Sequence, residues 1–326
     1  MRYDIIGDVH GQASKLEALL SNMGYQERAG AWSHRESVAI FVGDFIDRGP
    51  RQMDTIKIVR AMVDAGSALA IMGNHELNAI GWVTPSQREP GDFLRTRRGS
   101  KGANNLHHHQ AFLDQVGAGS KAHSELIAWF MALPLWLDLP ELRVVHACWH
   151  PLAIESIKAR LGGSNRLDSE KIREALDDMD GARSAPGEPL GLFESIELVC
   201  KGVEIPLPGG ATFVDPAGYE RSRVRSRWWD AGARTFKSCA MLSESEKSEL
   251  DDGPIPASCV VELPSDKPIF FGHYWMTGVP APLGDLVACV DYSAAKSGPL
   301  VAYRYSGEAK LAAANFVSSD PLGWAV

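Results

Sequence analysis

The sequence predicts an α/β fold in which parallel strands alternate with crossover helices. Two observations lead to this prediction. Up to residue 72, apolar runs of strand length alternate with amphipathic segments of helix length, and β-α-β-α-β order favours parallel strands. The chain has 326 residues, 45% of them hydrophobic, so it can bury a large core as one big domain or two modest ones.

The early elements can be assigned in order from their periodicity. The first apolar run, 3–7, has the character of a buried strand, and the helix after it has Leu16, Leu19 and Leu20 on one face. Gly24 stops this helix. The expected elements are a strand over 3–7, a helix over 12–23, a strand over 38–42, a helix over 52–64 and a strand over 68–72.

The later chain has a second group of strands and a segment of different character. Further elements are a helix over 124–133, strands over 135–139 and 143–146, and strands over 269–273, 286–291 and 300–305. Between the two strand groups, the segments 155–160, 168–179 and 190–201 are helical and charged, and the residues after them are rich in Gly, Pro and Ser. We interpret 150–262 as a region inserted into a single domain that spans 1–326.

Three short blocks of candidate metal ligands follow three of the early strands. They are Gly7-Asp8-Val9-His10-Gly11, Gly43-Asp44-Phe45-Ile46-Asp47-Arg48-Gly49 and Gly73-Asn74-His75-Glu76. Open α/β sheets hold their ligands at the carboxyl ends of strands. Asp8 and His10 are two residues apart, so both side chains leave an extended strand end on the same face. Asp44 offers two oxygens and is able to bridge two ions.

Carboxylate, imidazole and amide ligands without a thiolate suit a hard or borderline divalent metal better than structural zinc. Any single block is equally well explained as ordinary turn and capping residues. The three blocks in this order favour a metal site.

The three blocks resemble the calcineurin-like metallophosphoesterase superfamily, and within it the phosphoprotein phosphatases, whose pattern is GDxHG, GDxxDRG and GNHE. The resemblance implies two packed β-sheets, a sandwich flanked by helices, with 150–262 as a cap that sets substrate choice. It also implies two histidines that end later hydrophobic strands, and His146 and His273 fit. A lone histidine after a strand is more often a hydrogen-bonded core residue, but the upstream blocks reverse that expectation.

The residues after these histidines depart from the family pattern. Ala147-Cys148-Trp149 and Tyr274-Trp275 stand where phosphoprotein phosphatases usually have glycines and a threonine. The departure leaves the ligands intact and the substrate class open.

The resemblance implies two divalent metal ions and a role for each nearby residue. The first ion is assigned to Asp8, His10 and Asp44, and the second to Asp44, Asn74, His146 and His273. We expect a hydroxide bridging the two ions to attack phosphorus directly. Arg48 then stabilises the phosphate charge, and His75, oriented by Asp47, protonates the leaving oxygen. Manganese is the expected metal, with iron or zinc behind it.

Two carboxylates are expected to support the ligands from outside. Glu76 ends the third block, and Asp291 ends the strand over 286–291. In this chain a strand ends in Asp291, and a loop leads from it to Gly298-Pro299-Leu300. This order of strand, Asp, loop and Gly-x-Leu is similar to the ending of bacterial diadenosine tetraphosphatases and of the phosphatase module of bacterial polynucleotide kinase-phosphatase. Outer carboxylates commonly orient imidazole ligands.

The segment from 221 to 229 combines arginines with two tryptophans. The candidates for a second phosphate clamp are Arg221, Arg223, Arg225 and Arg227. On one strand all four would line one face and present bidentate donors to phosphate; a solvated basic edge strand explains them equally well. Trp228 and Trp229 would stack on an aromatic substrate or, as the safer interpretation, pack in the core.

The region 84–109 carries further basic residues and the run His107-His108-His109. Adjacent histidines on a helix cannot converge on one ion, so we interpret this run as a solvated polar face.

The composition limits the classes of binding partner and the cellular compartment that we expect. A net charge of -8 and a pI near 5.7 argue against a protein that coats nucleic acid. The cysteines number five, are widely spaced and form no C-x-x-C, which favours a reducing cytoplasm. We expect no signal peptide and no membrane span.

Three functional hypotheses follow. The first is a phosphomonoesterase acting on a nucleotide, a nucleic-acid end or a phosphoprotein. The second is a hydrolase of dinucleoside polyphosphates such as diadenosine tetraphosphate. The third, a non-catalytic metal-binding scaffold, is the weakest because a purely structural metal site would not need Arg48 and His75.

Overall fold

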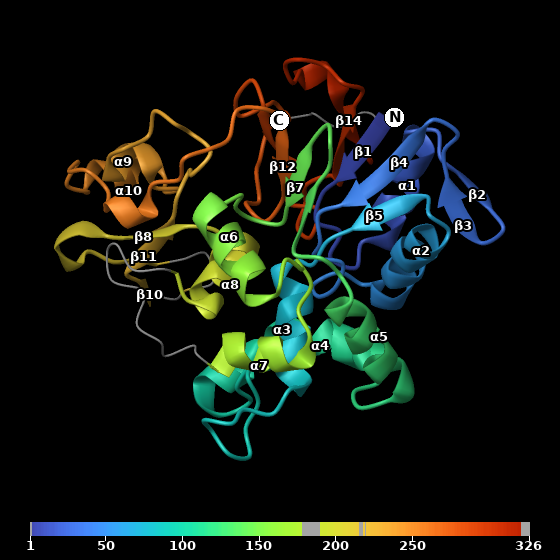
Figure 1. The fold of residues 1–326 in the computed structure, drawn as a ribbon, viewed down its shortest axis with the longest axis horizontal. Helices are drawn as coiled ribbons and strands as arrows, with labels where there is room; N and C mark the ends of the chain where they lie inside the picture. The colour runs from blue at the N-terminus through green and yellow to red at the C-terminus, as the bar shows by residue number, and fades with distance from the viewer. Residues whose placement is uncertain (1, 178–189, 215–217, 219, 321–326) are drawn as a thin grey trace.

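The structure is a computed structural model, and it describes residues 2–177, 190–214, 218 and 220–320. Two β-sheets form its centre (Figure 1). The five-stranded sheet has the order β15 (Phe316–Ser318), β14 (Val301–Tyr305), β1 (Arg2–Ile6), β4 (Ser37–Phe41) and β5 (Ala68–Ala70). The four-stranded sheet has the order β13 (Val287–Cys289), β12 (Ile269–Phe271), β7 (Arg143–Val145) and β6 (Trp136–Asp138).

The strand directions agree with the predicted βαβ units. β1 pairs with β4, and β4 with β5, in parallel. β12 pairs in parallel with both β7 and β13, whereas β14 and β6 run antiparallel to their neighbours β1 and β7. The parallel strands of each sheet therefore end at the same edge.

The two sheets pack face to face, as the family resemblance implied. Ile5 and Ile40 of one sheet belong to the same buried cluster as Val144 and Phe270 of the other. The Phe270 ring lies 5.1 Å from the ring of Tyr303 across this interface. Alternate residues of each strand face this cluster, which is the pattern of a sandwich interior.

Helices cover the outer face of each sheet (Figure 1). The outer face of the five-stranded sheet packs against α1 (Ala13–Asn22) and α2 (Gln52–Asp64), through residues such as Leu16 and Val59. Beside β7 and β12 lie α6 (Pro151–Arg160) and α8 (Leu192–Lys201). Both helix layers belong to one larger buried cluster that continues around the sheets.

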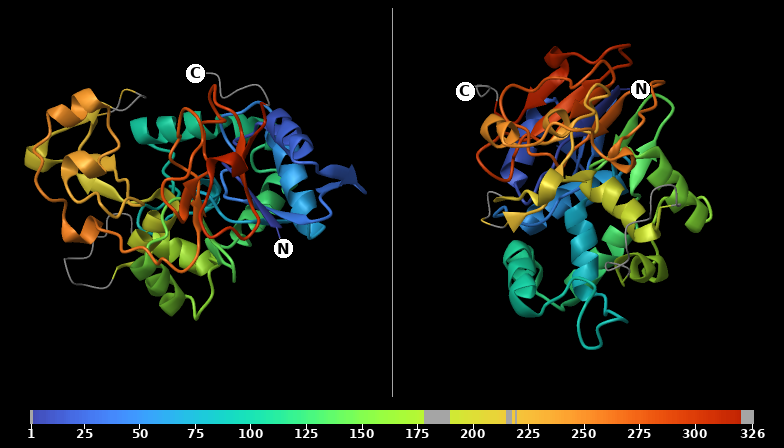
Figure 2. Two further views of the ribbon diagram at one scale, coloured as in Figure 1. Left: turned by 90° about the horizontal axis from the view of Figure 1, so that it is seen from above. Right: turned by 90° about the vertical axis from the view of Figure 1, so that its left-hand side faces the viewer.

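Residues 151–262 contain more than the predicted charged helices. α7 (Ser169–Asp177) comes between α6 and α8 in the sequence and packs against α8, and residues 178–179 of the predicted helix fall outside the described residues. β8 (Glu204–Pro206) pairs antiparallel with β11 (Arg223–Arg225), and β9 (Phe213–Val214) pairs with β10 (Glu220–Arg221). With α9 (Phe236–Cys239) and α10 (Glu244–Ser248), they form the end of the molecule far from α1 and α2 (Figure 2).

Several elements were not predicted from the sequence. Among them are the hairpin of β2 (Gln26–Arg28) and β3 (Ala31–Ser33), the helix α4 (Gly99–Val116) and the edge strand β15. The predicted helix over 124–133 corresponds to α5 (Lys121–Met131), and Asn74 begins α3 (Asn74–Val83). Among the described residues, no helix has the length and apolar character needed to cross a membrane.

Candidate metal centre

The candidate ligands come from five loops at one end of the sandwich. Asp8 and His10 follow β1, Asp44 follows β4, and Asn74 begins α3 after β5. His146 follows β7 of the other sheet, and His273 follows β12. Because all five strands run in parallel within their sheets, their carboxyl ends converge. The structure therefore brings together the six ligands predicted from the sequence.

The backbone at this site is unusual. The left-handed region is sparsely populated by residues other than glycine, yet φ is 46° at His10, 53° at Asp44 and 72° at His273. Asp47 and Arg48 both have φ of 70°. Such conformations persist where the surrounding structure fixes them, and they gather at functional sites.

Two glycines of the motifs are explained by close contacts with ligands. A Cβ atom on Gly73 would overlap the Asp44 carboxylate, and one on Gly272 would overlap the Asp8 carboxylate. Any larger residue would push a candidate ligand out of place.

One group of ligand atoms gathers around Asp44 Oδ1. Asp44, His146 and His273 each offer one ligand atom, and these atoms all lie within 4.8 Å of one another. His146 Nε2 lies 3.4 Å from Asp44 Oδ1. Asn74 Oδ1 lies 3.0 Å from His146 Nε2 and 2.8 Å from His273 Nδ1. The four side chains thus face one point, as the assignment to the second ion requires.

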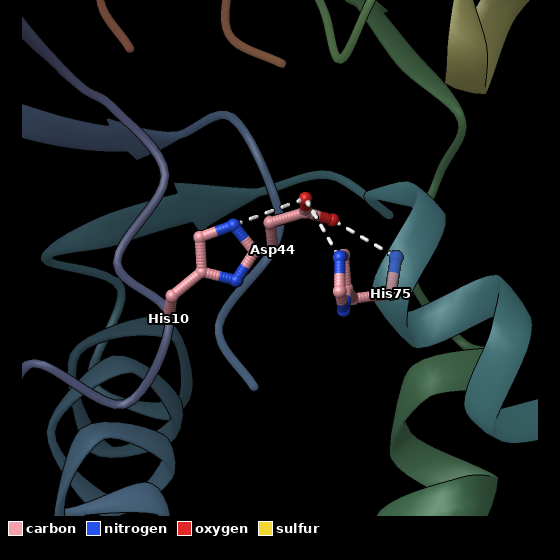
Figure 3. Close-up of side chains that lie close together, drawn as sticks. All are labelled: His10, Asp44 and His75. Atoms are coloured by element: carbon pink, nitrogen blue, oxygen red, sulfur yellow. Dashed lines mark hydrogen bonds and ion pairs between the residues drawn. The ribbon is translucent and has the colours of Figure 1, made fainter. Parts of the chain in front are cut away.

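A second group lies on the other oxygen of the same carboxylate (Figure 3). His10 Nε2 is 3.5 Å from Asp44 Oδ2, and His75 Nε2 is 3.9 Å from it. This group differs from the predicted first site, because it contains His75 and does not contain Asp8. The Asp8 carboxylate accepts the backbone N–H of His273 at Oδ2.

Two buried atoms show that the residues present fit a cation. Asp8 Oδ1 and His10 Nε2 are buried and have no hydrogen-bond partner among the described residues. A buried polar atom without a partner is unfavourable, and both atoms are of types that divalent metals bind. His10 Nδ1 meets the carbonyl of Ile46 at 2.9 Å, and His146 Nδ1 meets that of Val42 at 2.7 Å, which leaves each Nε2 for a metal.

The pKa shifts of Asp8 and His10 also favour a bound cation. Burial, together with the carboxylate of Asp291, raises the pKa of Asp8 well above its usual value. Burial and the neighbouring His75 lower the pKa of His10 to about 3, so its imidazole is neutral near pH 7. Neutral imidazole is the metal-binding form of histidine. A cation would relieve the crowding of buried carboxylates.

His75 makes its strongest contact with Asp47. His75 Nδ1 lies 2.5 Å from Asp47 Oδ2, so Nε2 faces the Asp44 carboxylate. The other Asp47 oxygen, Oδ1, meets His109 Nδ1 at 2.7 Å. His109 had been predicted on a solvated face, and that prediction is wrong, because His109 is only 3% exposed.

The position of His109 could have been found from helix periodicity. Gly102, Asn105, His109, Phe112 and Val116 recur at helical spacing, and all are buried on one face of α4. His107 lies on the exposed side of the same helix. The triple histidine therefore divides between a buried and an exposed face.

A cluster of cationic groups surrounds Trp275 beside the ligands. The guanidinium of Arg48 lies 4.4 Å from the centre of the Trp275 ring, and the Lys296 ammonium lies 4.2 Å from it. The Arg225 guanidinium is 5.8 Å from the same ring and donates from Nη1 to the carbonyl of His273 at 3.1 Å. Trp275 is one of the residues that depart from the family pattern in the sequence.

The four candidate arginines do not share one strand, which corrects the sequence interpretation. Arg221 is exposed on β10, and Arg223 on β11 donates to the carbonyl of Glu204. Arg227 lies after β11 and pairs with Asp230 at 3.7 Å. Arg225 contacts a candidate ligand, because its guanidinium donates to the carbonyl of His273. The chain bends between β10 and β11, and this bend breaks the expected row of side chains.

The two tryptophans pack in the core, as the safer interpretation expected. Trp228 and Trp229 are buried, and both rings lie against Phe271 of β12, at 4.9 and 5.2 Å. They attach the β11 segment to the sheet that carries His273.

The two supporting carboxylates lie behind the ligands. Glu76 Oε1 accepts from the backbone N–H of Phe45, and Oε2 accepts from those of Asp44 and Gly73. Asp291 accepts from the backbone N–H groups of Trp275 and Ser293. Both carboxylates therefore hold loops that carry predicted site residues.

A cavity of about 390 Å³ opens beside α3. Asn78, one turn along α3 from Asn74, forms part of its wall. The basic side chains that line it are Arg88, Arg95, Arg98, Lys101 and Lys201. Phe93 and Phe193 also line it. We call it the α3 cavity.

Comparison with known proteins places these features in a family. The model of the calcineurin-like phosphoesterase family matches residues 1–174. The asymmetrical bis(5'-nucleosyl)-tetraphosphatase PrpE of Oceanobacillus iheyensis is 47% identical over 76 residues, which are 23% of this chain and 30% of that protein. The corresponding protein of Halalkalibacterium halodurans is 41% identical over 76 residues, 23% of this chain and 31% of that protein.

The chain thus spans about a third of the length of these curated relatives. Among solved structures, a cold-active protein-tyrosine phosphatase of a Shewanella species covers 98% of this chain at 18% identity, with a TM-score of 0.45 and 80% of its own chain covered.

Proposed function

Because this chain belongs to the calcineurin-like phosphoesterase family, whose members hydrolyse phosphoric esters, we propose that it is a phosphomonoesterase that uses two divalent metal ions. Water or hydroxide attacks phosphorus directly, without a covalent enzyme intermediate. Phosphate and the dephosphorylated alcohol are the products.

One observation carries this proposal. The two oxygens of the buried Asp44 carboxylate face different groups of histidines: Oδ1 lies 3.4 Å from His146 Nε2, and Oδ2 lies 3.5 Å from His10 Nε2. A carboxylate between two such groups is suited to bridge two ions. A single structural ion would not need ligands on both sides of it.

We assign the ion ligands from the family pattern together with this geometry. Asp8, His10 and Asp44 would hold the first ion, and Asp44, Asn74, His146 and His273 would hold the second. When bound, two such ions lower the pKa of a shared water, neutralise phosphate charge and align the in-line displacement. Manganese is the favoured metal because every ligand is an oxygen or an imidazole nitrogen; iron and zinc are the alternatives.

The chain supplies cationic groups that suit phosphate. The guanidinium groups of Arg48 and Arg225 lie 4.4 and 5.8 Å from the centre of the Trp275 ring, and both are able to bind phosphate oxygens in bidentate fashion. We assign Arg48 to the charge that develops on the equatorial oxygens. Arg225 is the second clamp, which selects one residue from the four candidates in the sequence.

His75 is assigned as the general acid. Its Nδ1 meets the Asp47 carboxylate at 2.5 Å, so Asp47 fixes the tautomer and the orientation of the ring. Nε2 is the nitrogen that faces the Asp44 carboxylate. Protonation of the leaving oxygen matters most when that oxygen is strongly basic.

The region 150–262 is proposed to set substrate choice as a cap, because it places Arg225 beside His273 while the ligands themselves recognise only phosphate. The substrate is then a phosphorylated nucleotide, nucleic-acid end or protein. We place the enzyme in the cytoplasm, which the five buried, free cysteines support.

Hydrolysis of a dinucleoside polyphosphate is a second candidate. It is favoured by the names of the curated relatives and by the α3 cavity. The cavity is lined by five basic side chains, which outnumber its carboxylates Glu89, Asp92 and Glu197 and suit additional phosphates. Phe93 and Phe193 also line it and suit a nucleobase.

A comparison of substrates tests both candidates. Metal-loaded protein is given a phosphopeptide, a 3'-phosphorylated oligonucleotide, a nucleoside monophosphate and diadenosine tetraphosphate at equal concentration. Higher kcat/KM on a monoester supports the first proposal. Higher kcat/KM on diadenosine tetraphosphate replaces it by the second, and loss of that preference in Arg95→Ala would assign the α3 cavity to the nucleotide.

A further inference from the structure

Asp47 accepts hydrogen bonds from two buried imidazoles at once. Its Oδ2 lies 2.5 Å from His75 Nδ1, and its Oδ1 lies 2.7 Å from His109 Nδ1. All three residues are at least nine-tenths buried. His75 faces the metal ligands, whereas His109 stands on α4, on the far side of Asp47.

The protonation pattern of this trio follows from its contacts. Burial alone would raise the pKa of Asp47, but the hydrogen bonds from His109 and His75 outweigh it and hold that pKa below its usual range. An ionised carboxylate only accepts hydrogen bonds. Each Nδ1 therefore carries a hydrogen, and His109 Nε2 is buried without a hydrogen-bond partner among the described residues.

We propose that His109 is a positioning residue that acts on the reaction through Asp47 and His75. Its Nδ1–H holds Asp47 Oδ1, and this fixes the plane of the carboxylate so that Oδ2 aims at His75 Nδ1. The proposal rests on the assignment of His75 as the general acid. His109 itself touches no candidate ligand and no reacting atom.

The surroundings of Asp47 explain why a second donor is needed. Asp47 is at a left-handed backbone position, φ 70°, and its own N–H is bound by Gln52 Oε1 at 2.7 Å. Its backbone is thus fixed, but the side-chain torsion is not. Without His109, the Oδ1 atom would be buried without its donor, which is unfavourable. Rotation of the carboxylate to recover a partner would move Oδ2 away from His75.

The helix that carries His109 is itself attached to the Asp47 loop. Gln115 on α4 accepts the backbone N–H of Gln52 at 2.8 Å and donates to the carbonyl of Pro50 at 2.8 Å. His109 and Gln115 therefore hold α4 against the same loop at two points. Trp82 and Phe112 lie beside the His109 ring, at 5.9 and 5.1 Å between ring centres, and restrict its rotation.

Two variants of similar size separate hydrogen bonding from packing. His109→Asn keeps an N–H donor near the position of Nδ1, and His109→Leu removes it. His107→Leu, on the exposed face of the same helix, is the matched control. Each protein is assayed on p-nitrophenyl phosphate, whose leaving group needs little protonation, and on phenyl phosphate, whose leaving group needs much.

We expect His109→Leu to lower the ratio of kcat on phenyl phosphate to kcat on p-nitrophenyl phosphate by about tenfold to a hundredfold, the usual range for a supporting residue. His109→Asn recovers most of the ratio, and His107→Leu does not change it. The ratio is independent of the fraction of folded enzyme. An unchanged ratio in His109→Leu, or equal ratios in the Asn and Leu variants, overturns the proposal.

A double variant tests the route through His75. In a His75→Ala background, His109→Leu should have no further effect on the ratio; a full additional loss would contradict the proposal. Nitrogen-15 histidine NMR needs no turnover. The Nδ1 proton of His75 should be protected from exchange in the parent and in His109→Asn, and exposed to exchange in His109→Leu. Equal protection in all three would overturn the positioning role, whereas failure of the phosphatase assignment would show only as an inactive parent.

Discussion

Glu76 Oε2 accepts a 2.8 Å hydrogen bond from the backbone N–H of Asp44, so the last residue of the third motif fixes the backbone at the candidate bridging ligand of the second. The Glu76 carboxylate also accepts the backbone N–H groups of Phe45 and Gly73, at 2.8 and 3.0 Å. Asp44 in turn accepts the backbone N–H of His75 at 2.9 Å. The second and third motifs therefore form one hydrogen-bonded unit.

We expect Glu76→Gln to destabilise this unit. The amide places an NH2 donor where one carboxylate oxygen accepts buried N–H groups, and two donors facing each other lose about 1 to 3 kcal/mol per unsatisfied group. Thermal unfolding should occur at a lower temperature, and metal content should fall. Glu27→Gln, on the exposed strand β2, is the control. Unchanged stability and metal content would show that Asp44 is held by other contacts.

Metal removal is expected to abolish activity. Asp8 Oδ1 and His10 Nε2 are buried without hydrogen-bond partners among the described residues, and the Asp44 carboxylate faces histidines on both sides. Protein dialysed against chelator should not hydrolyse p-nitrophenyl phosphate, and added Mn²⁺ should restore hydrolysis. Titration should show two ions per chain. Full activity after chelation, with no metal detected, would refute the two-ion site.

These two predictions rest on residues that the sequence identified, and the reason is local. Each of the six ligands stands directly after an apolar run or at the start of the next helix, so its place in the fold depends on one strand end. The arrangement of the strands in two sheets was implied by the family resemblance. Periodicity alone predicted a parallel arrangement only for β1, β4 and β5.

The positions of His109 and Arg225 depend on tertiary packing, and for this reason the sequence did not give them. His109 meets Asp47 because α4 is attached through Gln115, 63 residues from its partner Gln52. Arg225 reaches His273 because Trp228 and Trp229 pack on Phe271 and so attach the β11 segment to β12. Neither contact is visible in a short motif, although the buried face of α4 could have been read from its periodicity.

His75→Ala should separate acid catalysis from metal binding. His75 is close to His10 and Asp44, at 3.9 Å from Asp44 Oδ2, so it has the geometry of either a ligand or an acid. As an acid, its loss lowers kcat on phenyl phosphate by about a hundredfold or more, with a much smaller effect on p-nitrophenyl phosphate.

Metal analysis decides between the two roles. His75→Ala should keep its full metal content, whereas Asp44→Asn, which weakens the bridging group, should lose metal and activity together. Loss of metal in His75→Ala, with equal losses on both substrates, would make His75 a ligand instead.

The last prediction concerns Arg225. Its guanidinium donates to the carbonyl of the candidate ligand His273 at 3.1 Å and lies 5.8 Å from the Trp275 ring, which Arg48 also covers. A charge-assisted hydrogen bond to phosphate contributes about 1.5 to 3 kcal/mol, so Arg225→Ala should lower kcat/KM roughly tenfold to a hundredfold on every substrate. Arg225→Lys keeps the charge but loses bidentate geometry, and should recover only part of the activity.

Arg227→Ala, whose side chain pairs with Asp230, and Arg221→Ala, on exposed β10, serve as controls with near-normal rates. Metal content should be unchanged in all four variants. If Arg225→Ala weakens one substrate alone, this arginine recognises the body of that substrate; if it loses metal, its role is to support the His273 loop.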